Sequence, residues 1–150
     1  MATEIERKFV VDELPAEVLG WSVETIQQGY VAVESDVEVR LLRRGGRFFE
    51  TVKIGSGQVR QELEVELEAF QFECLWPAAS ERSLEKRRFV GEVAERTFEV
   101  DVYEGRLAGL VVVEVEFPDR EAAIGFIPPA WFGREVTDDP DYANRNLALG

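Results

Sequence analysis

The chain has 150 residues, 45% hydrophobic and 11% aromatic, which is enough apolar mass for a core and excludes an intrinsically disordered chain. We predict a single domain over residues 1–150. The formal net charge of −13, from 17 Lys and Arg against 30 Asp and Glu, excludes nucleic acid and anionic membrane surfaces as expected partners.

Alternation of apolar and polar residues with period two predicts β-strands along most of the chain. In chain order the alternating segments are residues 4–11, 36–42, 48–54, 60–68, 84–90, 97–103 and 110–117. A turn at Arg44-Gly45-Gly46 joins the second to the third. Many strands with tight turns predict an antiparallel sheet, and closure into a barrel would remove its edges.

Helices are fewer and shorter in the predicted fold. Start and stop signals, such as Asp12 with Gly20 and a capping Asp119, predict four of them. They cover residues 12–20, 69–76, 119–126 and 140–149.

Three features predict a soluble, cytoplasmic protein. Cys74 is the only cysteine, so no intrachain disulfide can form, which suits a reducing compartment. The first residues lack the apolar segment of a signal peptide. No apolar run approaches the roughly 20 residues that a membrane-spanning helix needs.

The polar faces of the predicted strands carry almost only ionisable side chains of both signs. Residues i and i+2 of a strand share a face and lie about 7 Å apart. By this rule the carboxylate pairs are Glu4/Glu6, Glu62/Glu64 and Glu114/Glu116, the cationic pair is Lys86/Arg88, and further cations are Lys8, Arg40 and Lys53. One such pair alone would be interpreted as a solvated strand face, but recurrence on several strands indicates a functional surface. Enclosed charges need partners, and a phosphate chain bound through divalent cations would satisfy both signs.

Other catalytic schemes fit the composition poorly. The chain has no histidine, which excludes His-based triads and His-ligated zinc. Cys74 lies in the apolar segment 70–76 and is interpreted as buried packing rather than as a nucleophile. No glycine-rich phosphate loop of the Walker or dinucleotide type is present.

The segment Glu4-Ile5-Glu6-Arg7-Lys8 resembles the N-terminal Glu-x-Glu-x-Lys signature of the CYTH superfamily, the triphosphate tunnel metalloenzymes. The resemblance covers essentially the whole chain. It continues through Val39-Arg40-Leu41, Thr51-Val52-Lys53, Gln61-Glu62-Leu63-Glu64, Glu85-Lys86-Arg87-Arg88, Asp101-Val102-Tyr103, Val113-Glu114-Val115-Glu116-Phe117, Gly133-Arg134-Glu135-Val136-Thr137 and Tyr142-Ala143-Asn144. It implies a mainly β (α+β) fold: a closed, eight-stranded antiparallel barrel that forms a tunnel lined by charges, with a few short peripheral helices.

The same resemblance implies an enzyme that acts on triphosphates with Mg²⁺ or Mn²⁺. The implied metal ligands are Glu4, Glu6, Glu114, Glu116 and Asp101. The implied phosphate contacts are Lys8, Arg40, Lys53, Lys86 and Arg88. The residues assigned to catalysis are Lys8, Glu62, Glu64 and Lys86, with the general base left open between a carboxylate and a lysine of lowered pKa.

One position departs from the pattern of the superfamily, which often has Arg-x-Arg on the second long strand. Leu42 stands two residues after Arg40, on the same face, where the second arginine is expected. Arg43 has the opposite parity unless a bulge shifts the register. The sequence therefore predicts weaker or rearranged phosphate binding, and a lower KM in Leu42→Arg.

The leading hypothesis is hydrolysis of a linear triphosphate, inorganic tripolyphosphate to pyrophosphate and phosphate, because short chains of this kind most resemble the bacterial tripolyphosphatase branch. The alternatives within the superfamily are class IV adenylate cyclase and thiamine triphosphatase. A module that binds polyphosphate or nucleotide without turnover, or an acidic β-domain for protein interactions, also stays open. Residues 125–132 are interpreted as core packing, with a tunnel-mouth cover or a homodimer interface as alternatives.

Overall fold

The computed structural model describes residues 5–55 and 61–150, and its main element is one eight-stranded antiparallel sheet. The strands are β1 (Ile5–Val10), β2 (Ser22–Glu34), β3 (Val37–Arg44), β4 (Arg47–Ile54), β5 (Gln61–Leu67), β6 (Ser83–Val93), β7 (Arg96–Tyr103) and β8 (Val111–Phe117). Their order in the sheet is β1-β8-β7-β6-β2-β3-β4-β5. The mainly β fold with an antiparallel sheet of eight strands is thus confirmed.

The helices are short. The α-helices are α1 (Ala69–Leu75), α2 (Arg120–Gly125) and α3 (Asn144–Leu149), and the 3-10 turns are η1 (Ala16–Gly20), η2 (Trp76–Ala78), η3 (Ser80–Arg82), η4 (Gly105–Leu107) and η5 (Pro140–Tyr142). Within the described parts of the chain, none of them combines the length and the apolar character needed to cross a membrane.

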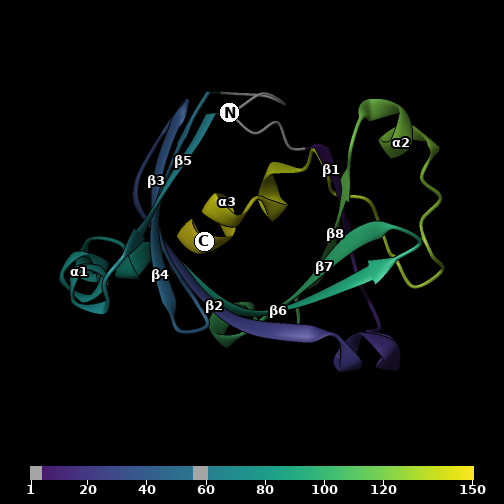
Figure 1. The fold of residues 1–150 in the computed structure, drawn as a ribbon, viewed down its shortest axis with the longest axis horizontal. Helices are drawn as coiled ribbons and strands as arrows, with labels where there is room; N and C mark the ends of the chain where they lie inside the picture. The colour runs from purple at the N-terminus through teal and green to yellow at the C-terminus, as the bar shows by residue number, and fades with distance from the viewer. Residues whose placement is uncertain (1–4, 56–60) are drawn as a thin grey trace.

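The sheet bends strongly, so that β3, β4 and β5 face β1, β7 and β8 across a concave side (Figure 1). Helix α3 lies within this concavity, whereas α1 and α2 lie outside it (Figure 1). The C-terminal end of the chain is therefore surrounded by strands from both halves of the sheet.

The two end strands of the sheet, β1 and β5, are not hydrogen-bonded to each other in the described residues. The outer edge of β1 is paired instead with the chain that follows α2. Gly133 N donates to Val10 O at 2.7 Å, Val10 N donates to Arg134 O at 3.0 Å, and Val136 N donates to Lys8 O at 2.8 Å. These bonds satisfy backbone groups that an open edge would leave exposed. Closure into a barrel stays a prediction.

The largest apolar core lies on the convex side of β1, β6, β7 and β8. Its buried members include Phe9, Phe89, Phe98, Val100, Val113, Val115 and Phe117. The rings of Phe126, Trp131 and Phe132 pack on Phe98, with centroids 5.6–6.4 Å apart. The interpretation of residues 125–132 as core packing is thus confirmed for Phe126, Trp131 and Phe132, whereas Ile127 is 86% exposed.

Three elements differ from the sequence prediction. The helix predicted over 140–149 is interrupted at Ala143, whose backbone is extended, and divides into η5 and α3. The pattern does not predict β2, because polar and apolar residues mix on both faces and the register against β3 shifts between Tyr30 and Ala32. The helix predicted over 12–20 begins only at Ala16, since Pro15 disfavours helical geometry at Leu14. The capping role of Asp119 is confirmed, because its Oδ1 accepts a hydrogen bond from Ala122 N at 2.8 Å.

Gly91 on β6 lies directly beneath the indole of Trp21, so that an added Cβ would come within 2.3 Å of the ring. We expect Gly91→Ala to lower the free energy of unfolding by about 1–3 kcal/mol, the usual cost of overpacking. Urea denaturation measures the change. Gly46→Ala is the control, because a Cβ there meets nothing within 4 Å. Equal stability of the two variants would contradict the expectation.

Candidate active site

Within the described residues, the charged side chains singled out in the sequence gather on the concave side of the sheet, because directly paired residues of neighbouring strands share a face. On β1, β8 and β7 the pairs are Glu6↔Glu116, Lys8↔Glu114 and Glu114↔Glu99. On β6 and β7 they are Lys86↔Tyr103 and Arg88↔Asp101. On β3, β4 and β5 the rows are Glu38↔Lys53↔Glu62 and Arg40↔Thr51↔Glu64.

Lys86 is completely buried, with 0% of its surface exposed. Its Nζ lies 2.8 Å from Asp101 Oδ2 and donates to Asn144 Oδ1 of α3 at 3.4 Å. Burial lowers the pKa of Lys86, although the charge of Asp101 opposes the shift. A buried lysine whose pKa is lowered is a candidate for acid–base chemistry.

Asp101 joins the two cations of β6. It accepts two hydrogen bonds from Arg88, Nε to Oδ1 at 2.8 Å and the second guanidinium nitrogen to Oδ2 at 2.9 Å. Burial alone would raise the pKa of Asp101, but Lys86 and Arg88 outweigh it and hold that pKa well below its usual value. Asp101 therefore stays ionised. Arg88 would have to release Asp101 or its other carboxylate partner before its guanidinium could contact a substrate.

Glu99 is a member of this network that the sequence analysis does not single out. Its Oε2 lies 2.8 Å from the guanidinium of Arg88. Burial, together with the neighbouring Glu116 and Glu114, raises the pKa of Glu99 to about 7 against the attraction of Arg88. The alternation over residues 97–103 places Glu99 on the face of Asp101, so the i, i+2 rule applied to this strand would have found it.

The carboxylates of β1 and β8 form the acidic end of the site. Glu114 lies 3.3 Å from Lys8 Nζ, and Lys8 also donates to Tyr142 O at 3.1 Å. Burial would raise the pKa of Glu114, but Lys8 lowers it on balance. Glu6 is half-buried opposite Glu116, and the predicted ligand Glu4 lies outside the described residues.

This acidic end has the donor chemistry of a Mg²⁺ or Mn²⁺ site. Within residues 5–55 and 61–150, no three ligand side chains are drawn together closely enough to hold an ion as they stand. The carboxylates are instead held partly by lysine and arginine, as in the pairs Lys8–Glu114 and Arg88–Asp101. Oxygen-only ligands suit hard divalent cations. A cation would also relieve the repulsion from Glu114 and Glu116, which adds to the burial that raises the pKa of Glu99. The residues therefore fit such a metal.

The opposite wall, on β3, β4 and β5, carries Arg40, Lys53, Glu62 and Glu64. Lys53 Nζ lies 4.0 Å from Glu62 Oε2, and Thr51 donates to Glu64 at 3.1 Å. Arg40 Nε is buried and has no hydrogen-bond partner in the described part of the chain. An unsatisfied buried guanidinium nitrogen is costly, which makes Arg40 a candidate for an anionic oxygen.

Leu42 shares the concave face with Arg40, as its parity predicts. It is 6% exposed and clusters with Ile26 and Phe49. Arg43 points to the other side of the sheet, where its guanidinium lies 5.7 Å from the ring centre of Phe48. The β-bulge of this region lies in β2 and does not bring Arg43 into the site.

Helix α3 supplies two side chains to the site. Asn144 Oδ1 accepts from Tyr103 Oη at 2.6 Å in addition to Lys86, and Arg145 lies 3.3 Å from Glu38 Oε1. Glu38 is itself buried, at 5% exposed. Tyr142-Ala143-Asn144 belongs to the motif set of the sequence, but no pattern in the sequence indicates that this segment lies inside the sheet.

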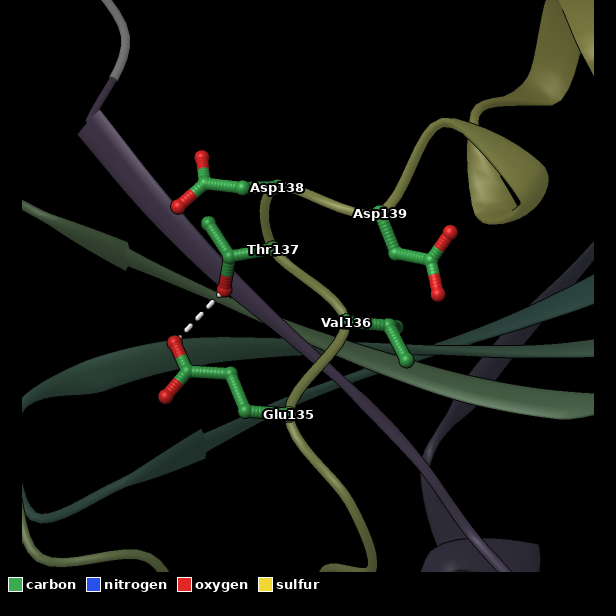
Figure 2. Close-up of a pocket in the computed structure, with 5 residues that line it drawn as sticks. All are labelled: Glu135, Val136, Thr137, Asp138 and Asp139. Atoms are coloured by element: carbon green, nitrogen blue, oxygen red, sulfur yellow. Dashed lines mark hydrogen bonds between the residues drawn. The ribbon is translucent and has the colours of Figure 1, made fainter.

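A separate surface pocket lies beside β1 and is lined by Glu135, Val136, Thr137, Asp138 and Asp139 (Figure 2). Thr137 donates to Glu135 at 2.6 Å, and Glu135 accepts two hydrogen bonds from Arg7 at 2.7 and 2.9 Å. Because this segment also pairs with the edge of β1, its polar groups serve to fix that strand.

Comparison with known proteins gives close relatives. The chain is 46% identical over 149 residues to an inorganic triphosphatase of Nitrosomonas europaea, covering 98% of this chain and 97% of the relative. It is 36% identical over 154 aligned positions to an inorganic triphosphatase of Acetivibrio thermocellus, covering 98% and 94%. A solved structure of an inorganic triphosphatase matches with a TM-score of 0.80 and 43% identity, covering 100% of this chain and 97% of that one. No family model matches the sequence.

Proposed function

The chain belongs to the inorganic triphosphatase family, and we propose that it hydrolyses inorganic tripolyphosphate to pyrophosphate and phosphate. The relatives confirm the resemblance to triphosphate tunnel enzymes drawn from the motifs. The observation that carries the proposal is the concave face, where buried cations and carboxylates from strands far apart in sequence meet.

The cations would bind the phosphate oxygens of the substrate. These residues are Lys8, Arg40, Lys53, Lys86 and Arg88. The buried Nε of Arg40, which has no hydrogen-bond partner among the described residues, supports this role most directly, because an anionic oxygen would supply an acceptor. Charges fixed in a site of low dielectric stabilise the negative charge of a loose phosphoryl-transfer transition state without reorganising.

We propose Mg²⁺ or Mn²⁺ as the cofactor. Glu6, Glu114 and Glu116 would hold it, together with Glu4 and Asp101. When bound, such a metal neutralises phosphate oxygens and lowers the pKa of a coordinated water. Lys8, now held by Glu114, would then be released to contact phosphate.

Lys86 is the group that we favour as the proton acceptor. A proton acceptor must be the neutral amine, and burial favours that form by lowering the pKa of Lys86. The contacts with Asp101 and Asn144 fix the position of Nζ inside the site. Glu62 and Glu64, the carboxylates considered for this role, stand on the end strand β5 in more solvated positions, with Glu64 exposed. We propose that these two glutamates orient Lys53 and Thr51, the residues directly opposite them on β4.

We propose further that the concave side serves as the tunnel that the resemblance implies, closed around its substrate. The curvature of the sheet and the position of α3 inside it support this (Figure 1). The prediction that Cys74 is buried packing is wrong, because Cys74 is exposed on α1, where Phe72 is the buried residue. A cytoplasmic location remains our proposal, supported by this exposed free thiol, which suits a reducing compartment.

A substrate panel tests the proposal. Purified protein with Mg²⁺ or Mn²⁺ is offered tripolyphosphate, ATP and thiamine triphosphate in turn, and phosphate, pyrophosphate and cyclic AMP are measured. Phosphate and pyrophosphate from tripolyphosphate are expected. Cyclic AMP from ATP, or turnover confined to thiamine triphosphate, would favour the other two activities of the superfamily. Tight binding of tripolyphosphate without any product would indicate a capture module.

A further inference from the structure

An apolar layer interrupts the ionisable face of β2, β3 and β4. It consists of Ile26, Leu42 and Phe49, which are 2%, 6% and 4% exposed. Leu42 pairs with Phe49 across β3 and β4, in the row next to Arg40 and Thr51. The three side chains therefore face the same concave side as the proposed phosphate contacts.

Two solvent-exposed ion pairs lie near the β3–β4 turn, on the side of the layer away from Arg40. Arg44 lies 3.7 Å from Glu24, and Arg47 lies 2.7 Å from Glu66. The guanidinium groups of both arginines also lie over the ring of Phe49, at 4.8 and 5.2 Å from its centre.

The burial of the layer means that this end of the concave face is closed. A passage wide enough for a hydrated phosphate chain would leave the side chains along it accessible to water, whereas these three are at most 6% exposed. These close-packed apolar side chains offer neither space nor a hydrogen bond to a further group. Gln28, opposite Leu42 on β2, is also buried, and its amide donates to Tyr30 Oη at 2.9 Å. On β6, Lys86 stands directly opposite Ile26, so the layer borders the proposed proton acceptor.

We propose that this apolar layer is a stop for the end of the substrate, so that the protein binds only chains with a free terminal phosphate. This inference rests on the proposed function. The chain would enter from the side of Glu62 and Lys53 and place its terminal phosphate beside Arg40 and Lys86. A substituent on that phosphate would have to displace Leu42 or Phe49. Leu42 is then a specificity residue, and an arginine at this position would disrupt the layer rather than lower the KM.

Binding of methyl-esterified triphosphates tests the inference. Isothermal titration calorimetry in EDTA measures the Kd of tripolyphosphate, of triphosphate methylated at one end, and of triphosphate methylated at both ends. The singly methylated chain keeps one free end and should bind within a few-fold of tripolyphosphate. The doubly methylated chain should bind at least about tenfold more weakly than the singly methylated one, the usual discrimination for one unaccommodated carbon.

Two neighbouring leucines provide matched variants. Leu42→Ala makes room in the layer and should reduce the difference between singly and doubly methylated chains. Leu41→Ala is the control, because Leu41 is equally buried but packs on the other face against Phe72 and Ala79. If Leu42→Ala unfolds the protein, the milder Leu42→Val takes its place, with folding checked by circular dichroism.

Two results would overturn the inference alone: equal Kd values for singly and doubly methylated chains in the unmodified protein, or the same change in both leucine variants. Failure of tripolyphosphate itself to bind, with or without Mg²⁺, would instead refute the proposed function and the stop together.

Discussion

Lys86→Met is expected to lower kcat for tripolyphosphate about 10²–10⁴-fold, the range for loss of a positioned acid–base group. The fold should persist, because methionine retains much of the apolar stem and Asp101 keeps its two hydrogen bonds from Arg88. Initial rates of phosphate release against substrate concentration give kcat and KM, and thermal unfolding gives the stability. A role in the transition state lowers kcat more than it changes KM.

Arg87→Met is the matched control for this experiment. Arg87 is adjacent on β6 but points to the outer side, where it pairs with Glu104 at 2.9 Å in a solvent-exposed position. Near-normal kcat is expected, since such a surface pair contributes little. A Lys86→Met protein that is folded and within tenfold of normal kcat would show that Lys86 is not the proton acceptor.

Glu6→Gln is expected to weaken metal binding and to lower kcat/KM about 10²–10³-fold at low Mg²⁺, since metal assistance is worth several kcal/mol. The amide retains the shape of the side chain but removes one negative charge opposite Glu116. Raising the Mg²⁺ concentration should restore part of the activity. Binding of Mn²⁺, measured by electron paramagnetic resonance, reports the ligand role independently of turnover.

Glu121→Gln serves as the control for the loss of one carboxylate, because Glu121 is exposed in the first turn of α2, outside the concavity. Its Mn²⁺ affinity should equal that of the unmodified protein. Unchanged Mn²⁺ affinity in Glu6→Gln would remove Glu6 from the metal site.

The charged face could be predicted from the sequence because strand geometry is local. Alternation alone places Glu114 with Glu116 and Lys86 with Arg88, and the sheet brings these pairs together as expected. Alternation does not identify strand β2, because the register shift between Tyr30 and Ala32 breaks the period of two. Both faces of this strand also carry polar and apolar residues together. Closure of the sheet depends on how its two ends meet, which no local pattern fixes.

The parts of the site that the sequence does not indicate depend on long-range packing. Asn144 contacts Lys86 across 58 positions of the chain, and only the folded structure places α3 inside the sheet. Leu42 is recognisable in the sequence as a departure from the Arg-x-Arg pattern of the superfamily. Its packing partners Ile26 and Phe49, however, come from other strands. The packed apolar layer around this leucine can therefore be recognised only once the register of β2, β3 and β4 is known.

Metal-dependent hydrolysis of tripolyphosphate is tested most directly by ³¹P nuclear magnetic resonance of tripolyphosphate mixed with the purified protein and Mg²⁺. Pyrophosphate and phosphate are expected to appear in equal molar amounts as tripolyphosphate disappears, and EDTA is expected to stop the reaction. Tripolyphosphate that stays intact with Mg²⁺ and Mn²⁺, or a hydrolysis rate that EDTA leaves unchanged, would contradict this expectation.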